Sequence, residues 1–352
     1  VGFYHQFCAS DYPKAAVWYA RARDGFSAAD RGPEGVLTEL FLTHTAMYQG
    51  DLETAETRCL RTLLRAREVG APMCESAAAH TRAEIECRRG RYGLATRRLS
   101  EALLLHRRVR NPGHEALTLG NMAMVCEHGH DYALAYSYWV AMVPIEVRLG
   151  RQAGWPELMA GKCAELLGRR RDARRWYAAS MDRYSGRSNE AGMASAAIAA
   201  ACLDIDAGRI DAARASVCSA VVIAAQRDAP DLLHKCADVG GRLCSRLGDA
   251  TSGVLLLGYG SSVRGPPEGF GARSTYLLAD QAAAVAESDI REALGVERFT
   301  SVHDAGRRLD RDQAADVLRA RLCPAGEGTS RESGVEAPGD RAYDMTGKES
   351  AE

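Results

Sequence analysis

Two copies of the short sequence motif that decides the fold are Gly50-Asp51-Leu52-Glu53-Thr54-Ala55 and Gly90-Arg91-Tyr92-Gly93-Leu94-Ala95. This motif, here called the anchor, occurs seven times in the 352 residues, at intervals of 40, 40, 40, 38, 40 and 40 residues. Internal repetition at a fixed period indicates a stacked repeat protein. The anchors are Ser10-Asp11-Tyr12, Gly50-Asp51-Leu52, Gly90-Arg91-Tyr92, His130-Asp131-Tyr132, Gly168-Arg169-Arg170, Gly208-Arg209-Ile210 and Gly248-Asp249-Ala250.

Small residues flank the anchors at fixed distances. A glycine at the anchor permits the left-handed backbone that ends a helix, and small residues on both sides let two helix axes approach closely. The pattern therefore predicts a helix, a tight turn and a second helix in each repeat. The turn glycines are Gly50, Gly90, Gly168, Gly208 and Gly248, and the packing alanines five residues after an anchor are Ala55, Ala95, Ala135, Ala173 and Ala213. The small residues seven positions before an anchor are Thr43, Ala83, Ala123, Gly161, Ala201 and Gly241.

The anchor resembles the Gly-x-[aromatic or aliphatic]-x-x-Ala turn of the tetratricopeptide repeat, lengthened by about one and a half helical turns. This resemblance implies an all-α solenoid of about seven antiparallel helix pairs over residues 1–265. Nine residues precede the first anchor, so we expect the first repeat to be truncated. Because the chain starts with Val1, we also expect it to be part of a longer protein or to carry a wrongly placed start.

The glycines at 258, 260, 265, 269 and 271, with Pro266-Pro267 among them, predict a long loop between helices rather than a phosphate-binding loop, which would need a preceding strand. A second unit follows the repeats, and we expect capping helices over residues 266–321. Ala293-Leu294-Gly295, Phe299 and Gly306-Arg307-Arg308-Leu309 resemble the closing segment of tetratricopeptide sensor regions in large bacterial signal-transducing ATPases, including LuxR-type and antibiotic-regulatory activators. The family's tryptophan position is His303 here. Residues 322–352 are rich in Pro, Gly, Ser and acidic side chains, which predicts a disordered acidic tail.

Composition argues against several function classes. A net charge of -1 is unusual for a dedicated polyanion binder. No P-loop, no G-x-S-x-G motif and no apolar run of transmembrane length is present, so we expect no cofactor, no enzyme activity and no membrane association. The eleven cysteines include no C-x-x-C pair, which favours reduced thiols in a cytoplasmic protein.

Two local clusters suggest sites. Cys126, His128 and His130 stand close together, but no second ligand pair is visible, and we expect no metal site. Arginines are dense at positions 88–110 and 169–175, which fits either a solvated surface or a stripe that attracts an acidic peptide, the chain's own tail or nucleic acid. We expect the solvated surface.

The groove of the solenoid is the main candidate site. In tetratricopeptide arrays the first helices of the pairs line the concave face, and counting back from each anchor selects polar and aromatic side chains there. The predicted groove residues are His44, Tyr48, His80, Glu84, Arg88, Glu127, His128, Lys162, Glu165, Asp206, Lys235, Arg242 and Arg246.

These observations predict a non-catalytic sensor or scaffold region of a bacterial signalling or transcription-regulatory protein. Its partner would be a protein or peptide in the groove, including an upstream ATPase domain of the same polypeptide. The alternatives are a free-standing adaptor and a nucleic-acid binder that uses the arginine clusters.

Overall fold

The computed structural model describes residues 1–7, 11–28, 32–151, 154–186, 188–227, 229–263, 287–288 and 290–323. These residues form helices joined by short connections, and they contain no strand. The all-α, tetratricopeptide-like solenoid is therefore confirmed. The helix pairs are α1 (Gly2–Phe7) with α2 (Tyr12–Ala28), α3 (Gly32–Tyr48) with α4 (Leu52–Glu68), α5 (Pro72–Arg88) with α6 (Tyr92–Arg108), α7 (Pro112–His128) with α8 (Tyr132–Arg148), α9 (Trp155–Leu166) with α10 (Arg170–Ser185), α11 (Glu190–Asp206) with α12 (Ile210–Gln226), and α13 (Pro230–Arg246) with α14 (Ala250–Val263).

The 40-residue repeat arises from a 20-residue unit used twice. From α3 to α8 each helix has 17 residues, and a three-residue connection leads to the next helix. A residue with positive φ stands in each of these connections and in those after α9, α10, α11 and α13. They are Gly50, Gly70, Gly90, Arg110, His130, Gly150, Gly168, Ser188, Gly208 and Gly248.

The same hydrogen bonds close both kinds of turn. At the anchor, the N–H of Gly50 donates to the carbonyl of Met47, and the N–H of Asp51 donates to that of Ala46, which is a Schellman motif. Between repeats, the N–H of Ala71 donates in the same way to the carbonyl of Ala66. Sequence comparison found only the anchors because the turns between repeats share less obvious residues. Their signal is a proline at the start of the next helix, as at Pro72 and Pro112.

Small residues lie where the two helices of a pair meet. Ala55, Ala95, Ala135, Ala173 and Ala213 are fully buried. A Cβ on Gly161 would lie 2.5 Å from the ring of Tyr177, so only glycine allows that approach of α9 to α10. Large side chains nine residues after an anchor, including Trp139 and Leu99, fill the space beside these contacts and are also fully buried.

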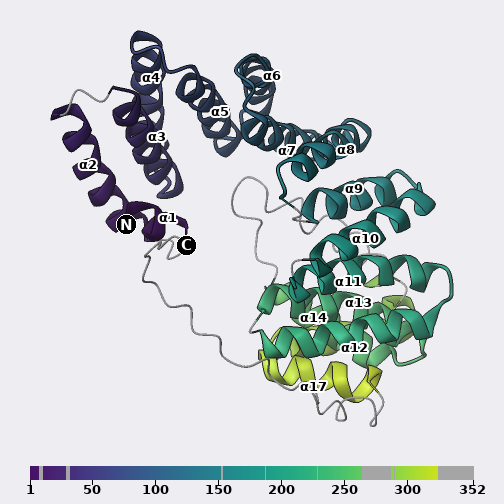
Figure 1. Ribbon diagram of the computed structural model, residues 1–352. Coiled ribbons are helices and arrows are strands. Elements are labelled where there is room, and N and C mark those ends of the chain that lie inside the picture. The colour runs from purple at the N-terminus through teal and green to yellow at the C-terminus, as the bar shows by residue number, and fades with distance from the viewer. Residues whose placement is uncertain are drawn as a thin grey trace, which may run out of the picture.

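The first helices of the pairs lie on the inside of the curve. Helix α3 contacts α5, α5 contacts α7, α9 contacts α11, and α11 contacts α13, whereas successive second helices make no comparable contact within the described pairs. Elements on the inner side of a bent stack are closer together than those outside. Figure 1 shows the helices following one another along this curved path. We call α3, α5, α7, α9, α11 and α13 the inner helices.

The regular stack is interrupted before α9. This helix has 12 residues, and its N-cap Gly154 has positive φ in addition to Gly150. The helix is five residues shorter than its counterparts and the connection before it three residues longer, which together give the single 38-residue interval between anchors. The contact between α7 and α9 is correspondingly weaker than those between the other neighbouring inner helices.

Two further helices cover the end of the stack. Helix α16 (Val296–Gly306) packs on α14, and α17 (Arg311–Leu322) packs on α12, α13 and α14. Leu318 and Leu322 enter the core beside α13. Helix α17 therefore extends one residue past the predicted end of the cap at residue 321. The remainder of the predicted tail, from residue 324 on, and the predicted loop around Pro266-Pro267 lie outside the described residues.

Two expectations about this region are wrong. Gly258 and Gly260 belong to α14 and not to a loop. A Cβ on Gly258 would lie 2.3 Å from the carbonyl oxygen of His303, so this glycine lets α14 approach α16. The expectation of reduced thiols fails for Cys218 of α12 and Cys323 after α17, which form a disulfide because the packing of α17 on α12 brings their Cα atoms to 5.5 Å.

Candidate functional site

The N-terminal part of the groove brings several predicted residues together. The guanidinium of Arg88 in α5 lies 4.7 Å from the ring centroid of Tyr48 in α3, and it pairs with Glu84 at 3.1 Å. On its other side, Tyr48 stacks on Tyr12 of α2 with ring centroids 5.5 Å apart. The ring of His44 lies one turn earlier on α3. A continuous strip of aromatic and charged groups thus crosses α2, α3 and α5.

His44 belongs to the floor of this strip. Its Nε2 lies 2.8 Å from the hydroxyl of Thr81 in α5, so a hydrogen bond links two inner helices. Burial lowers the pKa of His44, against the opposing charge of Glu84. The imidazole is therefore neutral near pH 7 and offers its two nitrogens as one donor and one acceptor.

The C-terminal part of the groove holds two lysines. Lys162 of α9 and Lys235 of α13 are half-buried, although they come from helices two repeats apart. Burial, followed by repulsion from Lys235, lowers the pKa of Lys162 to about 8. Burial also lowers the pKa of Lys235. Glu127 and Glu165 act against the lowering at Lys162, and Asp231 acts against it at Lys235, so charges of both signs meet in this section.

The acidic residues beside the lysines have partners of their own. The hydroxyl of Tyr177 donates to Glu165 at 2.6 Å. Asp206 of α11 accepts from Arg242 of α13 at 2.9 Å and lies 3.5 Å from Arg170. Arg246, one turn beyond Arg242, is exposed. The acidic groups therefore link neighbouring helices.

Two predicted groove residues are not in an open groove. His80 and Glu127 are only 6% and 4% exposed. The carboxylate of Glu127 accepts from the indole N–H of Trp139 at 2.7 Å and from the thiol of Cys163 at 3.3 Å. Their register places them on the sides of α5 and α7 that pack on neighbouring helices. Both are structural residues of the core, and their prediction as groove residues is corrected here.

His80 is part of a buried histidine cluster. Its Nδ1 lies 2.8 Å from the hydroxyl of Thr118, and its ring centroid lies 6.0 Å from that of His106, which is 5.3 Å from that of His114. Burial, with mutual repulsion as a smaller cause, lowers the pKa of His80 and of His106 to about 3. Neither nitrogen of His106 has a hydrogen-bond partner. These imidazoles are therefore neutral at pH 7.

The two histidines of the cluster considered as a metal site, His128 and His130, contact different partners. His128 stacks on Tyr92 with ring centroids 4.7 Å apart, and His130 lies 2.8 Å from the hydroxyl of Tyr132. Within the ranges that the structure covers, no three His, Cys, Asp or Glu side chains form a group that could hold a metal ion.

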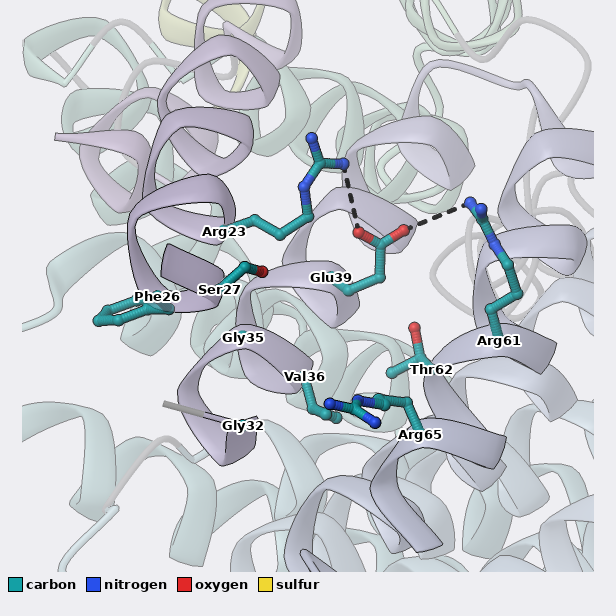
Figure 2. A pocket seen from close by; sticks show the side chains of 10 residues that line it. All are labelled: Arg23, Phe26, Ser27, Gly32, Gly35, Val36, Glu39, Arg61, Thr62 and Arg65. Carbon is teal, nitrogen blue, oxygen red and sulfur yellow. Dashed lines mark ion pairs between the residues drawn. The ribbon is translucent and has the colours of Figure 1, made fainter. Parts of the chain in front are cut away.

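A separate cavity of about 360 Å³ lies between α2, α3 and α4. Figure 2 shows Arg23 and Arg61 on opposite sides of Glu39, with Arg65 extending toward Val36. Phe26 forms an apolar part of the wall. The lining residues are Arg23, Phe26, Ser27, Gly32, Gly35, Val36, Glu39, Arg61, Thr62 and Arg65.

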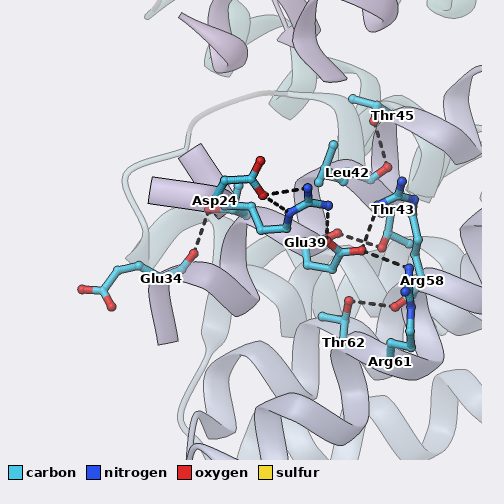
Figure 3. Close-up of polar contacts among 11 residues, drawn as sticks. Asp24, Glu34, Glu39, Leu42, Thr43, Thr45, Arg58, Arg61 and Thr62 are labelled. Atoms are coloured by element: carbon cyan, nitrogen blue, oxygen red, sulfur yellow. Dashed lines mark hydrogen bonds and ion pairs between the residues drawn. The ribbon is translucent and has the colours of Figure 1, made fainter. Parts of the chain in front are cut away.

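Glu39 is the centre of the charges around this cavity. Its carboxylate, whose side chain is 15% exposed, lies 2.9 Å from Arg58, 3.6 Å from Arg61 and 3.6 Å from Arg23. Figure 3 shows Glu39 of α3 facing Arg58 and Arg61 of α4. One carboxylate is thus shared by three guanidinium groups, each of which has five N–H donors.

Sequence comparison missed this cavity, although a signal was present. Charged residues stand at Arg23 and Glu39, where most other repeats have apolar or small residues. Tyr12 and Thr81 were also missed as groove contacts because they lie outside the counted register. The predicted residues that do meet one another are His44, Tyr48, Glu84 and Arg88 in one group, and Lys162, Glu165, Asp206, Lys235 and Arg242 in the other.

Many arginines in the two dense clusters form ion pairs. Arg89 pairs with Glu56 at 2.5 Å, and Arg174 pairs with Asp204 at 2.8 Å. The others with acidic partners are Arg88, Arg91, Arg98, Arg107 and Arg170. Much of their charge is therefore balanced locally. Among the described helices, none combines the length and the apolar character needed to cross a bilayer.

Comparison with known proteins supports the fold. No protein-family model matches the chain, and no curated protein does. The chain is similar to the crystal structure of BtubC (BKLC) from P. vanneervenii, with 17% identity and a TM-score of 0.55, over 62% of this chain and 92% of that one.

The chain is also similar to PH0952 from Pyrococcus horikoshii, a Signal Transduction ATPase with Numerous Domains (STAND) protein with a tetratricopeptide repeat sensor. The identity is 15% and the TM-score 0.55, over 84% of this chain and 42% of that one. At these identities the likeness shows the fold alone. The chain is a helical-repeat solenoid that resembles a tetratricopeptide repeat sensor.

Proposed function

We propose that this chain is a non-catalytic scaffold whose groove binds an extended acidic segment of a partner protein, as the sensor part of a bacterial signalling or transcription-regulatory protein. The observation that carries the proposal is the pair Lys162 and Lys235. Both ammonium groups are half-buried on inner helices, and burial, followed by repulsion from Lys235, lowers the pKa of Lys162. Glu127 and Glu165 offset part of this repulsion, and a ligand that brings further negative charge would offset more of it.

The remaining groove residues fit a peptide. Tyr48 and Arg88 offer a flat aromatic face and a guanidinium, which are the side-chain types enriched where proteins bind one another. His44 offers polar groups at the groove floor. An extended segment that contacted both parts would touch several inner helices at once.

A ligand of this kind would act through the curvature of the stack. Most inner helices contact the next one, so a segment that bridges them would favour one spacing over another. A shift of that equilibrium requires the ligand to bind one curvature more tightly than the other. The printed description of PH0952 as a STAND protein with a repeat sensor supports a sensor role by likeness of fold.

A nucleic-acid binder fits less well. Seven arginines of the dense clusters already pair with carboxylates, and the net charge of the chain is -1. No observation favours a free-standing adaptor over a sensor.

The proposal is tested by selecting peptides from a random nonapeptide display library on the full chain. The affinities of the selected peptides are then measured by fluorescence anisotropy. We expect acidic sequences whose binding is lost in the Lys162→Glu/Lys235→Glu variant. The control variant Arg171→Glu/Arg175→Glu makes the same charge change on the outer helix α10 and should keep binding. Equal loss in both variants would show that binding depends on net charge and not on the groove.

A further inference from the structure

The cavity between α2, α3 and α4 departs from the repeat pattern. The position of Arg23 is occupied in the next repeats by Leu63, Leu103, Val143, Met181 and Val221. The position of Glu39 is occupied by Ala79, Leu119, Glu157, Ala197 and Ala237. Most other repeats therefore fold with apolar or small residues where this one has charges. Residues that depart from the apolar pattern of the repeat are expected at functional sites.

The lining of the cavity is electropositive. Three guanidinium groups and one carboxylate line it, which leaves a net charge of +2. Arg23 also pairs with Asp24, and Arg65 with Glu68, but those acidic side chains are 69% and 63% exposed. Because ion pairs at such exposed positions are weak, a ligand oxygen can compete with these two carboxylates for the guanidinium groups. Glu39 holds Arg23 and Arg61 in position on either side of the cavity, as Figure 2 shows.

Other features of the wall suit a phosphate group attached to a small apolar body. The first turn of α3, at Gly32 and Gly35, directs the positive end of a 17-residue helix to the cavity. A Cβ on Gly35 would meet nothing within 4 Å, so the space beside it is open. Ser27 offers a hydroxyl, while Phe26 and Val36 offer apolar surface.

We propose that this cavity is a binding site for a phosphate monoester. Such a group carries close to two negative charges at neutral pH, which balances the +2 of the lining. Its oxygens accept paired hydrogen bonds from the N–H groups of a guanidinium. Arg61 and Arg65, one turn apart on α4, can donate these bonds. The volume of about 360 Å³ admits a phosphorylated side chain or a small phosphorylated metabolite. The site does not depend on the groove.

The test is a titration of the full chain by isothermal calorimetry with phenyl phosphate, inorganic phosphate, benzoate and a short phosphoserine peptide. Phenyl phosphate should bind saturably and more tightly than benzoate or inorganic phosphate. The phosphoserine peptide distinguishes the two sources. Tighter binding of the peptide assigns the site to a modified partner protein, and tighter binding of phenyl phosphate assigns it to a free metabolite.

Three variants locate the binding. Arg61→Ala should weaken phenyl phosphate roughly tenfold because a charge-assisted pair is lost. Gly35→Leu should abolish binding by filling the open space, while circular dichroism shows an intact fold. Arg67→Ala removes the same charge from the same helix but from a pair with Glu75 outside the lining, and it should change affinity less than twofold. Absence of saturable binding, unchanged binding in Gly35→Leu, or equal loss in Arg67→Ala and Arg61→Ala would overturn the proposal.

Discussion

The guanidinium of Arg88 lies 4.7 Å from the ring centroid of Tyr48, and this contact joins two successive inner helices at the floor of the groove. Arg88 is held there by Glu84, one turn away on the same helix. A cation over an aromatic ring at a partly exposed site contributes about 0.5 to 1 kcal/mol. The contact is therefore strong enough to align α3 with α5 and weak enough to yield to a ligand.

Replacing Arg88 with Ala should loosen the end of α3. We expect faster hydrogen exchange of the amides in the last turn of α3, because the ring of Tyr48 loses its partner on α5. The amides of α13 should exchange at their original rates. Unchanged exchange at α3 would mean that the contact does not couple these helices.

The effects of Arg23 and Glu39 on stability should be coupled. Glu39→Ala should lower the free energy of unfolding by about 1 to 3 kcal/mol, because three arginines lose their shared carboxylate. Arg23→Leu/Glu39→Ala recreates the Leu63 and Ala79 pattern of the next repeat and should recover part of that loss. Urea unfolding of both single variants and the double variant measures the coupling. If the effects of the two single substitutions simply added up in the double variant, the coupling would be contradicted.

Acid should destabilise the chain through its buried histidines. The pKa values of His80 and His106 are about 3 in the folded protein, below the usual value of about 6.5 that applies when unfolded. Between these values the unfolded chain binds more protons, so stability falls as pH drops below about 6.5, by about 1.4 kcal/mol per pH unit for each histidine.

His106→Leu tests this effect because it removes an imidazole whose nitrogens have no partner. The variant should be more stable than the natural chain at pH 5, and its stability should depend less steeply on pH. His130→Gln, at an exposed turn, serves as the control and should leave the slope unchanged. An unchanged slope in His106→Leu would contradict the assigned pKa. Denaturant unfolding at several pH values gives the slopes.

Glycine should stabilise the three turns in which the residue with positive φ is not a glycine. Arg110, His130 and Ser188 have positive φ, which costs an ordinary residue about 1 kcal/mol or more. Each change to Gly should therefore raise the free energy of unfolding by up to about 1 kcal/mol. The reverse change, Gly90→Ala, should lower it, although its Cβ would meet nothing within 4 Å. Stability losses in all three glycine variants would show that side-chain contacts dominate these turns.

Sequence was sufficient for the helix pairs because their requirements are local. Gly90 permits the turn and Ala95 permits the helix contact wherever they stand in the chain. The turns at Arg110 and Ser188 were harder to recognise because a non-glycine residue takes the positive φ there. The disulfide between Cys218 and Cys323 depends on how α17 packs on α12, which no spacing of cysteines encodes.

The groove was predicted in part for a similar reason. The distance of a residue from the anchor shows that it lies on an inner helix. It does not show whether the side chain points to the groove or to the neighbouring helix pair. Tyr48 is exposed and Lys162 is half-buried, whereas Glu127 turns inward to Trp139. The Glu39 cavity involves three helices from two repeats, so its arginines become neighbours only in the folded chain.

The most direct test of the groove proposal is photo-crosslinking of a selected acidic peptide to the chain. p-Benzoylphenylalanine is placed at Leu166, in the groove register of α9, or at Val222, an exposed position of the outer helix α12. The account predicts a crosslinked product from position 166 that unlabelled peptide suppresses, and none from position 222. Crosslinking from position 222 and not from 166 would contradict binding in the groove.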